Sequence, residues 1–133
     1  MTDQLRGFFE SYCETYDRFD IDGAAAFITR PLVIVRAGEV TVYDTPEEIR
    51  AYFAKLLEWF TGIRHGKGSI SRFEVRPLGE SSAFVNVVWR STRDDGAMYT
   101  EWPTAYHVVK VGATWKILMI VLRYEAPRET PCS

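Results

Sequence analysis

The feature that most constrains the fold of this chain is the change in its hydrophobic period near Gly66. Before that residue, apolar side chains recur at gaps of three and one, which is the spacing of one face of an α-helix. After it, apolar and polar side chains alternate in long segments joined by short turns, which is typical of antiparallel strands. Helices first and strands last predict an α+β domain rather than a parallel α/β one.

Two strong helical stripes lie in the first half of the chain. Their members are Leu5, Phe8, Phe9, Tyr12, Cys13 and Tyr16, and then Ile49, Tyr52, Phe53, Leu56, Leu57 and Phe60. The second stripe follows Thr45-Pro46-Glu47-Glu48, in which a threonine N-cap and a glutamate three positions later form a capping box. Both stripes predict helices that bury one face.

Weaker signals between the stripes predict a second helix and a hairpin. An aspartate-rich break at residues 20–23 caps a short helix over residues 24–28. This helix ends before Pro31, because the residue that precedes a proline disfavours helical geometry. Two β-branched segments then flank Ala37-Gly38 and predict a β-hairpin over residues 32–43.

Four long strand candidates follow. They cover residues 70–78, 83–91, 98–111 and 115–124. The connections between them are short and rich in glycine, as between consecutive antiparallel strands. We expect one domain over residues 1–126 and a C-terminal tail over residues 127–133.

This order of elements resembles the nuclear transport factor 2-like superfamily, with its SnoaL-like and ketosteroid isomerase-like branches. The matching motifs are Tyr12, residues 20–27, residues 45–49 with Tyr52-Phe53, and Trp115-Lys116-Ile117. The resemblance covers about residues 5–125. It implies a cone-shaped fold, a cystatin-like α+β roll, in which a curved antiparallel sheet and three helices of the N-terminal half enclose a pocket. These motifs mark the fold and specify no reaction.

Steroid isomerases of this fold place a tyrosine on the first helix, an aspartate base on the first strand and an acidic hydrogen-bond donor on the penultimate strand. The resemblance maps these positions onto Tyr12, Arg36 and Tyr106. Only the tyrosine matches, and Arg36 cannot act as a base because its guanidinium stays charged. We therefore do not expect steroid isomerase chemistry.

The resemblance also assigns the sides of the strands. If Tyr106 faces the pocket, alternation brings Trp102 to the same side, and Trp89 faces it from the preceding strand. The candidate ligand-binding residues are Tyr12, Tyr16, Arg36, Trp59, Trp89, Trp102 and Tyr106. Such a pocket suits a small organic ligand, and Arg36 suits a carboxylate, an enolate or a phenolate. The alternative is that the rings fill the core and that Arg36 is a solvated side chain beside a turn.

No other residues form a recognisable catalytic or metal-binding set. We interpret His65 as a loop histidine or a partner of the preceding helix C-terminus, with a catalytic base as the alternative, and His107 as outward-facing. Paired carboxylates, a nucleophile with its base, metal-ligand spacing and a glycine-rich phosphate loop are absent from the sequence. We expect no metal and no cofactor, and we assign no catalytic residue.

Charge and cysteine content narrow the expected partners and location. The net charge is −2 with both signs scattered, so neither nucleic acid nor a membrane surface is an expected partner. The sequence shows no bilayer-spanning segment and no signal peptide. Cys13 and Cys132 are interpreted as free thiols, with a bridge as the alternative, and the expected location is the cytoplasm.

The last predicted strand carries a different signal. Residues 117–122 are apolar at both alternating positions, which predicts burial on both faces. The helices cover one face, and no remaining element is available to cover the other. We therefore predict a homodimer through the outer sheet face.

These observations lead to two hypotheses from different classes. The first is a dimeric small-molecule-binding protein, or a weak isomerase-, cyclase- or dehydratase-like enzyme acting on a small ring or carbonyl compound. In that enzyme Tyr12 and Tyr106 would donate hydrogen bonds to an oxyanion, and Arg36 would hold negative charge. The second is a non-enzymatic interaction or dimerisation module with a filled interior, as nuclear transport factor 2 itself is.

Overall fold

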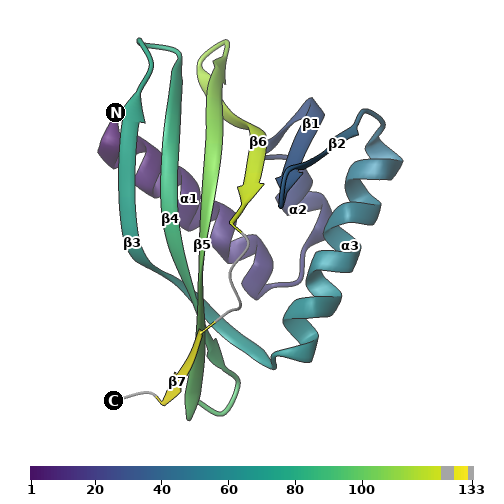
Figure 1. Ribbon diagram of the computed structural model, residues 1–133, viewed down its shortest axis with the longest axis vertical. Coiled ribbons are helices and arrows are strands. Elements are labelled where there is room, and N and C mark those ends of the chain that lie inside the picture. The colour runs from purple at the N-terminus through teal and green to yellow at the C-terminus, as the bar shows by residue number, and fades with distance from the viewer. Residues whose placement is uncertain (124–127, 132–133) are drawn as a thin grey trace.

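The computed structural model describes residues 1–123 and 128–131, which form three helices and a seven-stranded sheet. In chain order the elements are α1 (Thr2–Asp17), α2 (Ile21–Ala25), β1 (Ile28–Arg36), β2 (Glu39–Tyr43), α3 (Pro46–Gly62), β3 (His65–Pro77), β4 (Ser82–Arg93), β5 (Met98–Val111), β6 (Thr114–Leu122) and β7 (Arg128–Pro131). Figure 1 shows α1 behind the long strands β3, β4 and β5, and α3 at the side of the molecule near β2. The predicted α+β cone with its helices in the N-terminal half is confirmed.

The sheet is mixed, whereas the sequence predicted a wholly antiparallel one. Its strands lie in the order β2-β1-β6-β5-β4-β3, and the β1–β6 pair is parallel. Each of the pairs β3–β4, β4–β5 and β5–β6 is antiparallel, because a short turn reverses the chain between consecutive strands. These reversals determine the direction of β6 independently of β1. The first strand therefore lies beside the last long strand, inside the sheet.

The start of β1 corrects the predicted second helix. That helix ends at Ala25, and the strand begins at Ile28. Pro31 is accommodated in the strand because the register between β1 and β6 shifts between Ile28 and Val33. A proline within such an irregularity does not interrupt a ladder of hydrogen bonds.

The C-terminal part of the sheet adds one strand that the sequence did not indicate. This strand, β7, lies in the segment predicted as a tail, and it pairs with Met98–Glu101 of β5. Its sequence Arg-Glu-Thr-Pro lacks the apolar alternation on which the strand predictions depend. Tyr124, at the end of the last predicted strand, and Cys132 lie outside the described residues.

Local hydrogen bonds confirm the predicted capping box of α3, and they correct the start of α2, which begins at Ile21 and not at Ala24. At α3 the Glu48 backbone N–H donates to Thr45 Oγ1 over 3.2 Å, and the Thr45 N–H donates to Glu48 Oε1 over 3.1 Å. At α2 the Gly23 N–H donates to Asp20 Oδ1 over 2.9 Å. None of the helices in the described part of the chain combines the length and apolarity needed to cross a bilayer.

The core lies between α1 and the concave face of the sheet. Phe9, fully buried on α1, contacts rings on three strands: Phe73 on β3, Trp89 on β4 and Tyr106 on β5. The predicted strand alternation is confirmed by burial, since the side chains at 85, 87 and 89 are buried and Phe84 is 42% exposed. Alternation therefore separates an aromatic interior from an outer sheet face.

Candidate functional site

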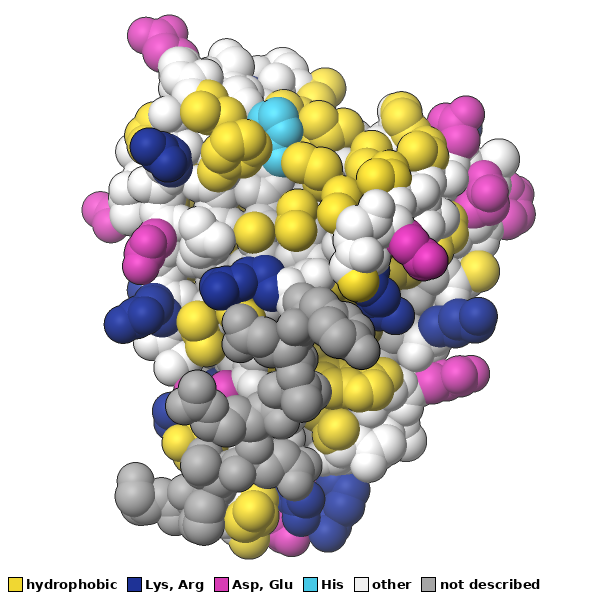
Figure 2. All heavy atoms as spheres, viewed as in Figure 1, with side chains coloured by type: hydrophobic (Ala, Val, Ile, Leu, Met, Phe, Trp, Pro, Cys, Tyr) yellow, Lys and Arg dark blue, Asp and Glu magenta, His cyan; other side chains and the backbone are white. Residues whose placement is uncertain are grey.

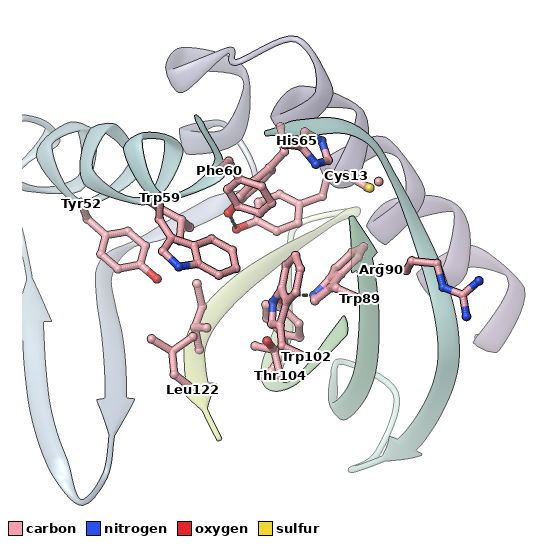
Figure 3. Close-up of a pocket in the computed structure, with 16 residues that line it drawn as sticks. Cys13, Tyr52, Trp59, Phe60, His65, Trp89, Arg90, Trp102, Thr104 and Leu122 are labelled. Atoms are coloured by element: carbon pink, nitrogen blue, oxygen red, sulfur yellow. Dashed lines mark hydrogen bonds between the residues drawn. The ribbon is translucent and has the colours of Figure 1, made fainter. Parts of the chain in front are cut away.

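An aromatic cavity, here called the inner chamber, opens between α1, α3 and the concave sheet face. Its volume is about 60 Å³. Six of the seven predicted site residues line it: Tyr12, Tyr16, Trp59, Trp89, Trp102 and Tyr106 (Figure 3). The sequence brought these rings together because helical spacing and strand alternation both direct them inward.

A larger and more open cavity, here called the outer recess, adjoins the inner chamber. Its volume is about 600 Å³, and it lies between α3, the β1–β2 hairpin and β5. The two cavities share the lining residues Tyr52, Leu56, Trp59, Trp102 and Leu122. The rings of Trp59 and Trp102 meet edge to face at 5.1 Å between centroids, at the boundary between the cavities.

Arg36, the seventh predicted residue, lines the outer recess and not the inner chamber. It is exposed and ends β1 on the side of the strand that carries the buried residues Leu32 and Ile34. The outer recess also has Lys55, Arg123 and Glu39 in its lining, so cationic side chains outnumber carboxylates there. Among the described residues no carboxylate lines the inner chamber.

The phenols of the inner chamber are protonated hydrogen-bond donors. Tyr12 and Tyr16 share a 2.5 Å bond between their hydroxyl oxygens, and Trp89 Nε1 donates to the Tyr106 hydroxyl over 2.8 Å. Burial is the main cause that raises the pKa of all three tyrosines above the ordinary value. The Tyr12–Tyr16 bond uses only one of the two hydroxyl protons, so the other proton is available to a further acceptor.

Tyr52 is a site residue that the sequence analysis assigned only to the helix core. Its hydroxyl is buried and has no hydrogen-bond partner in the described part of the chain. Figure 3 shows the hydroxyl on the side of the ring that faces Trp59 and Leu122. Residues 52, 56 and 59 form a second face of α3 beside its buried face, and this spacing is the signal that could have identified Tyr52.

His65 is buried at the first position of β3, which corrects its interpretation as a loop residue. Its Nε2 lies 2.7 Å from Asp17 Oδ1, its Nδ1 contacts Ser91 Oγ, and the Gly68 N–H donates to the same Asp17 oxygen over 2.8 Å. A carboxylate only accepts, so Nε2 donates to it and Nδ1 accepts from Ser91. Both ring nitrogens are engaged, and the network joins α1 to β3 and β4.

Two further side chains with reactive groups, Cys13 and His107, show no sign of activation. Cys13 lines the inner chamber as a free thiol, and burial, reinforced by Asp17 and other carboxylates, raises its pKa to about 12. His107 lies beside Phe84 in register on the outer face and forms a 2.6 Å bond with Ser82 Oγ. Within the described residues no cluster of three or more histidine, cysteine and acidic side chains could hold a metal ion.

The nuclear transport factor 2-like class is defined by a mixed, curved sheet. Its first helix, here α1, crosses the concave face, and its third helix, here α3, lies at the open side. The sequence profile of one family of this class, described as NTF2-like protein (DUF6841), matches residues 3–125. The chain therefore belongs to this family. A comparison with curated proteins gives no match.

Solved structures with the same fold are distant in sequence. An NTF2-like protein of unknown function from Shewanella oneidensis has a TM-score of 0.70 at 16% identity, over 92% of this chain and 98% of its own. A protein of unknown function with a cystatin-like fold from Nostoc punctiforme scores 0.67 at 12% identity, over 91% and 90%. A proposed aromatic ring hydroxylase from Novosphingobium aromaticivorans scores 0.67 at 16% identity, over 95% and 90%. At these identities the likeness establishes the fold.

Proposed function

We propose that the protein binds a small ring compound in the outer recess, with one end of the compound reaching the inner chamber. The observation that carries this proposal is that the two cavities are adjacent and share five lining residues. The inner chamber of about 60 Å³ is too small for a whole ligand, whereas the outer recess of about 600 Å³ lies in the range of small-molecule sites.

The polar groups favour a ligand with acceptor oxygens. Phenol hydroxyls line the apolar interior, and no carboxylate of the described residues competes with them there. A carbonyl oxygen bound among these donors would become more polarised, which is the basis of a weak isomerase- or cyclase-like activity. Binding is nevertheless the primary proposal, because the raised pKa of these phenols leaves them poor bases at neutral pH.

Calorimetry with a panel of small phenols, cyclic ketones and aromatic acids tests the binding proposal. We expect saturable binding of one ligand per chain, lost in Leu56→Trp, which fills the junction between the cavities. Val111→Trp, a matched enlargement at a residue 57% exposed, should leave binding unchanged. Binding that survives Leu56→Trp, or a panel in which nothing binds, would contradict the proposal.

A second candidate function, pairing of two copies through the outer sheet face, is supported by an apolar surface there. Strand register aligns two rows across the sheet: Phe84, His107, Met119, Val33 and Val42, and beside them Ala105, Val121, Val35 and Val40. Figure 2 shows hydrophobic side chains gathered on the upper part of this face. Valines at positions 40 and 42 are 65% and 53% exposed, which suits a surface that a second copy covers.

Sedimentation equilibrium tests the pairing. We expect a dimer at micromolar concentration for the wild type and a monomer for Val121→Lys, because a lysine in the centre of the rows would be buried without a partner. Val111→Lys adds the same charge at the end of β5 and should remain dimeric. A monomeric wild type would refute the pairing and leave the ligand proposal untouched.

A further inference from the structure

The unpartnered Tyr52 hydroxyl marks a position where the fold leaves a donor for something else. The ring is held by neighbours on two sides, with Tyr43 at 5.5 Å and Phe53 at 5.2 Å between centroids. Its hydroxyl oxygen is buried and has no partner among the residues that the structure describes. A buried donor without an acceptor costs free energy, so a ligand acceptor at this point would restore a lost hydrogen bond.

Arg36 supplies a positive charge to the outer recess, which Tyr52 also lines. Its guanidinium acts on the Tyr52 phenol, lowering a pKa that burial otherwise raises. Arg36 lies opposite Glu39 in the hairpin register, yet it forms no ion pair within the described part of the chain. An uncharged O–H donor and a cationic fork therefore border one recess, and both can donate to one acceptor there.

The surroundings select the kind of acceptor. Cationic side chains outnumber carboxylates in the outer recess, which favours an anion. The junction between the cavities is apolar, with Leu56, Trp59 and Trp102 in its walls. Removing a doubly charged group from water is far more costly than removing a singly charged one, so the junction favours a carboxylate over a phosphate.

We propose that Arg36 and Tyr52 form an anion subsite that binds the carboxylate of a small aryl or cyclic carboxylic acid, with its ring against Trp59 and Trp102. The guanidinium pairs with the carboxylate in the open part of the recess, and the Tyr52 hydroxyl donates to it from the buried side. This inference rests on the proposed ligand-binding function and adds the chemical class of the ligand.

Competition between matched probes tests the subsite. Benzoate and benzamide have nearly the same shape, and only benzoate is an anion at neutral pH. By calorimetry near neutral pH we expect benzoate to bind about tenfold more tightly than benzamide. Arg36→Gln should abolish this preference and Tyr52→Phe should reduce it, whereas Arg76→Gln and Tyr99→Phe, outside both cavities, should preserve it.

A stability measurement separates this role from a structural one. Without ligand, Tyr52→Phe should leave the melting temperature unchanged or raise it, because the variant removes a buried donor that has no partner. With saturating benzoate, the wild type should gain more thermal stability than the variant. A marked loss of melting temperature in Tyr52→Phe without ligand would show that the hydroxyl has a structural partner, and it would overturn the subsite.

Each binding outcome decides the inference separately from the proposed function. Equal binding of benzoate and benzamide would overturn the anion subsite and retain the ligand-binding function. Tighter binding of phenyl phosphate than of benzoate would replace the carboxylate by a phosphate and overturn the assignment. If neither benzoate nor benzamide binds, the anion subsite is overturned as well. The ligand-binding function is then retained if a neutral ring compound of the panel binds, and it is overturned if none does.

Discussion

At the residue scale, the Tyr12–Tyr16 pair shows how a polar group is stabilised inside an aromatic interior. The two hydroxyls bond to each other across one helical turn, with 2.5 Å between their oxygens. Tyr12→Phe keeps the ring and leaves the Tyr16 hydroxyl without this partner. We expect a loss of about 1 kcal/mol in the free energy of unfolding, measured by urea denaturation.

The double variant Tyr12→Phe/Tyr16→Phe is the sharper test of that pair. It removes both hydroxyls, so its stability should lie close to that of the single variant or above it. Fully additive losses would show that the two hydroxyls do not stabilise each other. Tyr99→Phe, at a residue of β5 outside the inner chamber, should change the free energy of unfolding little.

Asp17 is the residue on which the buried His65 network depends. One of its oxygens accepts hydrogen bonds from the Gly68 N–H and from His65 Nε2. Asp17→Ala leaves both donors unpaired, and we expect a loss of about 2 kcal/mol in urea denaturation. Asp3→Ala, at an exposed residue of the same helix, should have little effect, and similar losses in both variants would contradict the role of Asp17.

At the scale of elements, the capping box of α3 predicts a pH dependence of stability. Hydrogen bonds from the backbone N–H groups of Asp44 and Thr45 lower the pKa of Glu48 below 4.5. A carboxyl whose pKa is lower in the folded state stabilises the fold above its unfolded pKa, and this stabilisation is lost as pH falls. The wild type should therefore lose stability more steeply than Glu48→Gln below about pH 4.5.

Urea midpoints measured across that acid range would test the Glu48 prediction. Glutamine can still accept the capping hydrogen bonds but does not titrate, so it isolates the charge. Parallel acid profiles for the wild type and Glu48→Gln would contradict the prediction. A matched control is Glu47→Gln, one residue earlier on the exposed side of α3, which should leave the profile unchanged.

Helix α3 also shows where element prediction from sequence is complete and where it stops. The capping box and the apolar spacing predicted the helix and its start correctly, because both depend on local chemistry. The same spacing could not separate Phe53, in the core, from Tyr52, at the junction of the cavities. That distinction depends on which strands approach the helix, and a local pattern does not contain it.

At the scale of the whole molecule, the buried phenols predict sensitivity to alkali. Tyr12, Tyr16, Tyr52 and Tyr106 all have a pKa raised above 10.0, chiefly by burial. A group whose pKa is higher in the folded state contributes stability below its unfolded pKa, and the contribution is lost as pH rises. We expect stability to fall steeply above about pH 10.

Absorbance of phenolate and far-ultraviolet circular dichroism, followed together through that alkaline range, would test this expectation. These four phenols should ionise together with the loss of secondary structure, because the folded state holds them protonated. Phenolate absorbance from all four that rises while the circular dichroism is unchanged would contradict it. Tyr106→Phe should reduce the slope of stability against pH, since it removes one of the titrating groups.

The fold was more predictable from the sequence than the site, for a physical reason. Helical stripes and strand alternation are local, so they predicted the α+β order, whereas the inward direction of Trp89 and Tyr106 was assigned from the family resemblance and is confirmed by their burial. The parallel β1–β6 pair, and with it the position of Arg36 in the outer recess, depends on contacts between distant segments. His65 was misplaced because its partners, Asp17 and Ser91, come from other elements.

The β1–β6 neighbourhood also determines when the protein can fold. Val33 and Met119 are paired across the parallel register although most of the chain separates them. Until β6 has emerged from the ribosome, β1 and β5 each present an open edge that can pair with another chain. The molecule therefore has a high contact order and is expected to fold slowly for its size. Ile120 and Leu122 of β6 line the inner chamber, so the chamber cannot be complete before β6 has paired with β1 and β5.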